Sequence, residues 1–128
     1  MTDAGSLGGR GLQQVALYCH DTARAREFYS GVLGLAFLFE ASDMLFFQLK
    51  DMRLMVGKVR SPDQHVGGAI LYFDAPDIDT LGPALEAKGV RFTGPAIVVQ
   101  ETATHRLKLR EFRDPDGNAL ALMGLVAK

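Results

Sequence analysis

The residues of this chain that could bind a metal or react as nucleophiles are few and far apart. The three histidines, His20, His65 and His105, stand in different segments, and none has the spacing to another that a shared metal ion requires. Cys19 is the single cysteine, so one chain can form neither an internal disulfide nor a cluster of thiolate ligands. The simplest interpretation places His65 in an exposed linker and His20 at a capping or solvent-facing position.

The carboxylates offer two kinds of site. Asp114 and Asp116 belong to the run Asp-Pro-Asp-Gly, which is typical of a tight turn whose carboxylates cap backbone amides. Glu101 and Glu111 lie in apolar, strand-like runs, and the pattern does not give their direction. Either could act as a general base only if it were buried beside a ligand.

A row of cations alternates with leucines near the C-terminus. Arg106, Lys108 and Arg110 project from one face of a predicted strand. A solvated face explains this pattern most simply. If that face lined a ligand site instead, Arg110 together with Arg53 would favour a carboxylate or phosphate group, because a guanidinium binds such groups through two hydrogen bonds.

The elements that must position these residues occur in the same order twice. In the first half, Gln13 to Cys19 reads as a strand, and apolar residues at helical spacing from Thr22 predict a helix that Gly34 ends. Three further strands are predicted at residues 35–40, 44–49 and 53–58.

The second half repeats this order after a polar connector. It has strand patterns at 69–73, 96–101, 107–112 and 119–125, with a helical pattern that ends at Gly89. Gly82 and Pro83 interrupt the helical pattern, so we expect the helix to begin near Leu81 or to be kinked there, while two short helical turns remain an alternative.

A duplication explains the repeated order, with Gly34 aligned to Gly89. The predicted fold class is α+β: two βαβββ modules in tandem, each a cupped mixed sheet with one helix, together enclosing a concave cavity. We place a flexible tail at 1–11 and a single domain at 12–128, with module one at about 12–60, a connector at 61–67 and module two at about 68–126.

Composition excludes several classes of protein. A length of 128 residues fits one domain. The formal net charge of −1 gives no general attraction to nucleic acid or to anionic membranes. The apolar runs, such as Ala119 to Met123, are far shorter than the roughly 20 residues that cross a bilayer. A reducing, cytoplasmic location fits the cysteine content best.

Two phrases at opposite ends of the duplicated chain carry a family resemblance. The opening QQVALYCHDTARAREFYSGVLGL and the closing EFRDPDGNALAL resemble the vicinal oxygen chelate superfamily, which contains glyoxalase I, extradiol dioxygenases and the metal-free bleomycin-resistance proteins. The resemblance covers about Gln13 to Gly124 and implies four ligand positions in metal-bearing relatives. They fall on Gln14, on or near Met55, on Gly68 or Ala69, and on Ala121.

Three of these four positions cannot coordinate a metal ion. A lone amide oxygen, from Gln14, does not replace the hydration shell of a divalent cation. We therefore expect no metal and no other cofactor, unless the ligand positions have been assigned wrongly.

Small residues at ligand positions leave room for an organic molecule. If Gln14 faces the cavity, alternation sends Tyr18 the same way, and Gly68 likewise directs Tyr72 inward. The space beside these rings and Met55 suits an apolar or aromatic ligand with one or two hydrogen-bonding groups. Alternatively, neighbouring side chains fill the space as core.

The resemblance therefore implies a metal-independent protein that binds or sequesters a small molecule. The expected ligand-binding residues are Gln14, Tyr18, Arg53, Met55, Gly68, Tyr72, Arg110 and Ala121, and no catalytic residue is assigned. One alternative is a lyase, isomerase or dioxygenase, metal-dependent through unrecognised ligands or metal-free through Glu101 or Glu111. Another is a regulatory or interaction module. We expect a homodimer, from the family likeness and from the need to cover sheet edges.

Overall fold

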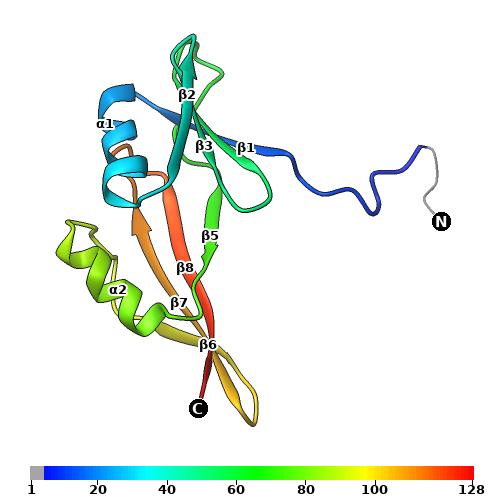
Figure 1. Cartoon of the computed structure of the whole chain (residues 1–128), viewed down its shortest axis with the longest axis vertical. Coiled ribbons are helices and arrows are strands. Elements are labelled where there is room, and N and C mark those ends of the chain that lie inside the picture. The colour runs from blue at the N-terminus through cyan, green and yellow to red at the C-terminus, as the bar shows by residue number, and fades with distance from the viewer. Residues whose placement is uncertain (1–4) are drawn as a thin grey trace.

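The computed structural model describes residues 5–128, which form two similar modules, one above the other in Figure 1. Part of the expected tail, residues 1–4, lies outside the described residues, and the chain from residue 5 to β1 extends away from the body. The first module contains β1 (Gln14–Cys19), α1 (Thr22–Arg26), η1 (Glu27–Val32), β2 (Ala36–Ala41), β3 (Met44–Gln48) and β4 (Arg53–Lys58). The second contains β5 (Ile70–Asp74), α2 (Ile78–Ala87), β6 (Ile97–Glu101), β7 (His105–Arg113) and β8 (Ala119–Ala127).

Each module has a four-stranded mixed sheet with the same topology. The strand order is β1-β4-β3-β2 in one sheet and β5-β8-β7-β6 in the other. In both sheets the first and last strands of the module pair in parallel, and the remaining pairs are antiparallel. The predicted tandem βαβββ fold is thereby confirmed. Among residues 5–128 there is no helix that has the length and apolar character to cross a membrane.

The first helix changes its winding halfway. Asp21 caps it by accepting a hydrogen bond from the backbone N–H of Arg24 at 3.0 Å. From Glu27 onward the helix is a π-helix, and the N–H of Leu33 bonds to the carbonyl five residues earlier. Gly34 then adopts a φ of 78°, which ends the helix as the sequence predicts.

The second helix begins at Ile78, so the expected start near Leu81 is wrong. The N–H of Leu81 donates to the carbonyl of Asp77 at 2.9 Å, and Ile78 is buried in the core. Packing of Ile78 into the core therefore stabilises the first turn, although Gly82 and Pro83 follow it in the helix. A Cβ at Gly82 would stand 2.8 Å from Nη1 of Arg110, so the end of that side chain would have to shift to make room for it.

The core lies between the two sheets and the helices that cover them. One cluster joins apolar residues of both modules; its members include Leu17, Tyr29 and Phe47 of module one and Phe112 and Leu120 of module two. Because successive side chains of a strand alternate, the other residues of each strand face away from the helices. We call this second side of each sheet the open face.

The turn between β7 and β8 joins the two modules through Asn118. This side chain is wholly buried. Its Nδ2 donates to the carbonyl of Tyr18 at 2.8 Å, and its Oδ1 accepts from the N–H of Gly67 at 2.7 Å. The ends of β1 and of the connector are thus held against the start of β8.

The aspartates of the same turn reach module one as well. Asp114 is buried and accepts a hydrogen bond from the hydroxyl of Tyr29 at 2.8 Å. Asp116 accepts from the backbone N–H of His20 at 2.9 Å and pairs with Arg24 at 3.2 Å. The run Asp-Pro-Asp-Gly-Asn therefore does more than form a turn: it fastens one module to the other.

Candidate functional site: the open faces of the two sheets

Three cross-strand rows make up the open face of module one. Residues paired in register share a face of the sheet. The first row is polar and contains Gln14, Arg53 and Gln48. The second is apolar and contains Ala16, Met55, Phe46 and Phe39, and the third contains Tyr18, Gly57 and Met44.

Arg53 is the only charged residue in these rows, and it is half-buried. Its Nη2 donates to Oε1 of Gln14 at 2.9 Å, and its Cζ lies 5.0 Å from the ring centroid of Phe46. Its Nε is buried and has no hydrogen-bond partner. No ion pair found within residues 5–128 includes Arg53. A guanidinium thus stands on this face without a carboxylate to neutralise it.

An aromatic pair lies beside Arg53, and sequence reasoning missed it. The rings of Phe39 and Phe46 stack with their centroids 4.5 Å apart and an interplanar angle of 21°. Phe46 is 8% exposed, whereas Phe39 remains 44% exposed. Strict alternation would place Phe37 and Phe39 on one face, but the register shifts between them, so Phe37 packs against the core residue Phe47 and Phe39 turns to the open face.

On the open face of module two, the side chains of adjacent strands cover the small residue Ala121. Ala121 pairs in register with Tyr72 on one side and with Glu111 on the other. Ala121 is 1% exposed and Tyr72 is 51% exposed. At Ala121, therefore, flanking side chains fill the space, as the core alternative predicts, and the apolar surface available to a ligand lies at Tyr72.

Gly68 lies before β5 in a loop, with a φ of 84° and no atom within 4 Å of the place a Cβ would take. It lines a hollow of about 410 Å³ with Ile70, Glu111 and Arg113. Glu111 faces this hollow but is paired with Nη2 of Arg113 at 2.9 Å.

Arg110 does not lie on the open face. Its side chain points to the other side of the sheet, toward α2, so the expected contact between Arg110 and a ligand is not formed there. Its Nη1 bonds to Glu86 of α2 at 3.0 Å, and its Nε donates to the carbonyl of Gly94 at 2.9 Å. Lys108, on the same face of β7, bonds to Asp79 of α2. The cations point toward the second helix because its acidic residues lie over that face, and the alternating leucines turn to the open face.

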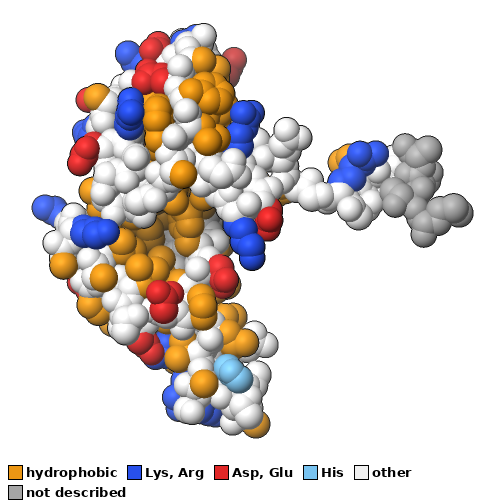
Figure 2. Space-filling view, viewed as in Figure 1, with side chains coloured by type: hydrophobic (Ala, Val, Ile, Leu, Met, Phe, Trp, Pro, Cys, Tyr) orange, Lys and Arg blue, Asp and Glu red, His pale blue; other side chains and the backbone are white. Residues whose placement is uncertain are grey.

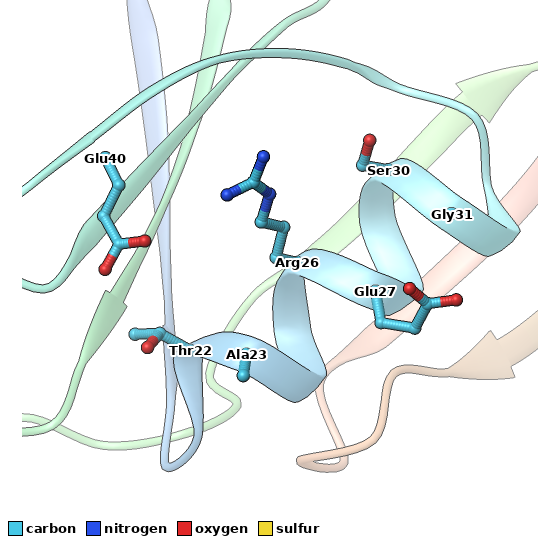
Figure 3. Close-up of a pocket in the computed structure, with 7 residues that line it drawn as sticks. All are labelled: Thr22, Ala23, Arg26, Glu27, Ser30, Gly31 and Glu40. Carbon is cyan, nitrogen blue, oxygen red and sulfur yellow. The ribbon is translucent and has the colours of Figure 1, made fainter.

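Other hollows lie away from the open face of module one. An apolar cleft lies between the modules, where hollows of about 190 and 710 Å³ share Phe73 and Asp74; apolar side chains gather there in Figure 2. The larger of the two also reaches Ile70 and Tyr72 on the open face of module two. A hollow of about 360 Å³ lies on the outer surface of α1 and η1. In Figure 3, Arg26 rises there between Glu40 and Ser30, and its guanidinium lies 3.8 Å from the ring centroid of Phe37.

Cys19 is buried and is not arranged as a nucleophile. Burial, followed by the charges of Asp116 and Asp114, raises the pKa of its thiol to about 11. Burial and the neighbouring Asp114 also raise the pKa of Tyr29. Both groups are therefore protonated at neutral pH, and both belong to the contact between the modules.

The sequence as a whole identifies the family. The profile of the glyoxalase/bleomycin resistance protein/dioxygenase superfamily matches residues 11–122, which is nearly the whole domain. The chain belongs to this superfamily. No curated protein sequence matches it.

Several solved structures share the fold of this chain at low sequence identity. Lactoylglutathione lyase from Agrobacterium tumefaciens is 21% identical, with a TM-score of 0.75 over 90% of this chain and 93% of that one. An antibiotic-binding protein from Streptomyces sp. CB03234 is 22% identical, with a TM-score of 0.72 over 96% and 100%. A glyoxalase family protein from Enterococcus faecalis is 23% identical, with a TM-score of 0.73 over 90% and 98%.

The superfamily's metal site does not fit the residues present. Of Gln14, Met55, Gly68 and Ala121, only Gln14 offers an oxygen donor, and that oxygen already accepts a hydrogen bond from Arg53. Within the described part of the chain, no three His, Cys, Asp or Glu side chains come together as a metal site. His20 and His65 are exposed, and a guanidinium next to Gln14 opposes a cation by charge.

Proposed function

We propose that this superfamily member binds a small organic molecule on the open faces of its sheets, without a resident metal ion. The supporting observation is that large apolar side chains stand exposed there, among them Phe39 at 44%, Ile70 at 46% and Tyr72 at 51%. Apolar surface that is left exposed beside a few polar groups is typical of a ligand site. One solved structure of the same fold is an antibiotic-binding protein, which supports this proposal.

A second copy of the chain completes the proposed site. Within residues 5–128 no helix covers the open faces, and β2 and β6 are edge strands that carry exposed apolar residues such as Phe39 and Ile97. A homodimer would cover both the edges and the faces. Light scattering should therefore give twice the chain mass of 13.9 kDa, and a monomer at micromolar concentration would contradict this part of the proposal.

Ligand titrations test the proposed site. Because a ligand that binds the native state raises its stability, members of a panel of small aromatic compounds should raise the melting temperature. Tyr18→Ala and Tyr72→Ala should lose most of this shift. Val98→Ala is the matched control, since Val98 is 49% exposed and pairs with Lys108 on the face turned toward α2. Equal shifts in all four proteins would argue against the open faces.

The carboxylates give no support to a second, enzymatic proposal. Glu101 is exposed at the β6–β7 hairpin and pairs with Arg106 and Lys128. Glu111 faces the open side, but Arg113 holds its carboxylate. A general base must accept a proton beside the bound ligand, whereas both carboxylates are partly exposed and are held by cations.

A further inference from the structure

Resting on the proposed function, we infer that the open face of module one selects flat aromatic molecules that carry a carboxylate or a similar oxyanion, with Arg53 as the anion-binding residue. The inference depends on the order of the three rows described above. A charged row lies next to an aromatic row, so one ligand of ring size can touch both. A neutral aromatic molecule would contact the aromatic row but would form no ion pair with Arg53.

The first step of the argument concerns charge. Arg24, Arg60, Arg106, Arg110 and Arg113 each have a carboxylate partner. Arg10, Arg26 and Arg91 have no such partner among residues 5–128, but they are exposed, whereas Arg53 is half-buried and bonds to the neutral amide of Gln14. A guanidinium that is half removed from water and lacks a counterion attracts an anion more strongly than a solvated one, because the surrounding medium screens its charge less.

The second step concerns the unused donors of Arg53. A guanidinium has five N–H donors, and Gln14 accepts from Nη2 alone. The buried Nε has no acceptor, and an unsatisfied buried donor is unfavourable. A carboxylate on the open face cannot reach the buried Nε, but it can accept from the unused N–H donors of Nη1 and Nη2 in the two-pronged geometry that matches its two oxygens.

The third step concerns where the ring would lie. Gln14 and Phe46 hold the guanidinium from two sides, so it is positioned before a ligand arrives, which reduces the entropic cost of binding. Phe39 keeps much of its surface exposed, and Met55 and Ala16 continue the same row. A flat ring placed on this row brings its acidic substituent to Arg53.

Binding of 1-naphthoate, compared with its neutral amide 1-naphthamide, tests the inference. Calorimetry with the full chain should show that the acid binds at least about tenfold more tightly than the amide. Arg53→Gln should abolish this preference and leave amide binding unchanged, and Arg53→Lys should keep part of it.

Arg106→Gln, which removes an exposed arginine of the distant β6–β7 hairpin, is the matched control and should retain the preference. Phe39→Ala should weaken the acid and the amide alike.

The Nε–H signal of Arg53 in nitrogen–proton NMR spectra gives a second readout, independent of protein stability. It should shift with 1-naphthoate and stay in place with 1-naphthamide. If both compounds shift the open-face resonances and Arg53→Gln changes neither affinity, the anion-binding role is wrong while the proposed function survives. If neither compound shifts any open-face resonance, both proposals fall.

Discussion

Gly124 shows how much a single position in β8 depends on the absence of a side chain. A Cβ there would stand 1.7 Å from the carbonyl oxygen of Ala75. That oxygen accepts the hydrogen bond of Ile78 that opens α2. The strand and the start of the second helix can therefore approach this closely only at a glycine.

Gly124→Ala should consequently destabilise the fold by about 3 kcal/mol or more, since the backbone cannot yield without breaking contacts of α2. Urea unfolding measures this. Gly94→Ala is the control, because nothing lies within 4 Å of its Cβ position, and it should change the free energy of unfolding little. Similar values for the two variants would contradict the close approach.

Because of Cys19, the free energy of unfolding should depend on pH in the alkaline range. Its folded pKa is about 11, against an ordinary value of 9.0, so between these values the unfolded chain has released the thiol proton and the folded chain has not. The free energy of unfolding therefore falls as pH rises from about 9 to about 11, by up to roughly 2 to 3 kcal/mol. Cys19→Ala should lose this component. Parallel curves of unfolding free energy against pH for the two proteins would contradict it.

At the scale of elements, the β7–β8 turn matters more than its sequence suggests. The Asp-Pro-Asp-Gly run predicts the turn itself, through local backbone chemistry. That the same turn binds β1, η1 and the connector depends on contacts across as many as 100 residues of chain. No local pattern contains that information.

Asn118→Ala should therefore weaken the contact between the modules. It removes the hydrogen bonds to Asp114, Tyr18 and Gly67 and leaves a buried carboxylate oxygen and two part-buried backbone groups with one partner fewer, at a cost of about 2 to 4 kcal/mol. The amide of Gly67 should also exchange with solvent faster. Gln64→Ala removes one side-chain bond within the connector and serves as the control. Unchanged exchange at Gly67 would show that Asn118 does not fasten the modules.

At the scale of the whole molecule, two modules of one topology share a single core while their open faces remain uncovered. The positions that the resemblance assigns to the superfamily's metal ligands lie on the strands β1, β4 and β8 and on the loop before β5, and in this chain they carry one amide and no imidazole or carboxylate.

Divalent metals should accordingly leave the protein's stability unchanged. Adding Ni²⁺, Mn²⁺, Zn²⁺ or Fe²⁺, or removing traces of metal with a chelator, should not move the melting temperature, because only a ligand that binds the native state raises it. Elemental analysis of protein purified without chelator provides the parallel measurement. A saturable rise with one metal, or a stoichiometric metal content, would overturn the assignment of Gln14, Met55, Gly68 and Ala121.

The sequence by itself determined the features that depend on neighbouring residues. The ends of the helices at Gly34 and Gly89, the turn at Asp114 to Gly117 and the duplicated order of strands all follow from backbone preference and short-range periodicity. In β1 the alternation that puts Gln14 and Tyr18 on one face puts Leu17 and Cys19 on the other, and both of these pack into the core.

Tertiary structure alone decided which side of β7 meets the helix. Alternation separates its cations from its leucines, but the acidic residues of α2 draw Lys108 and Arg110 to the covered side and leave the leucines on the open face. The shift of register in β2 likewise turns Phe39 outward. Both outcomes depend on partners distant in the sequence, because a strand's own pattern fixes which residues share a face and its neighbours in space decide what that face meets.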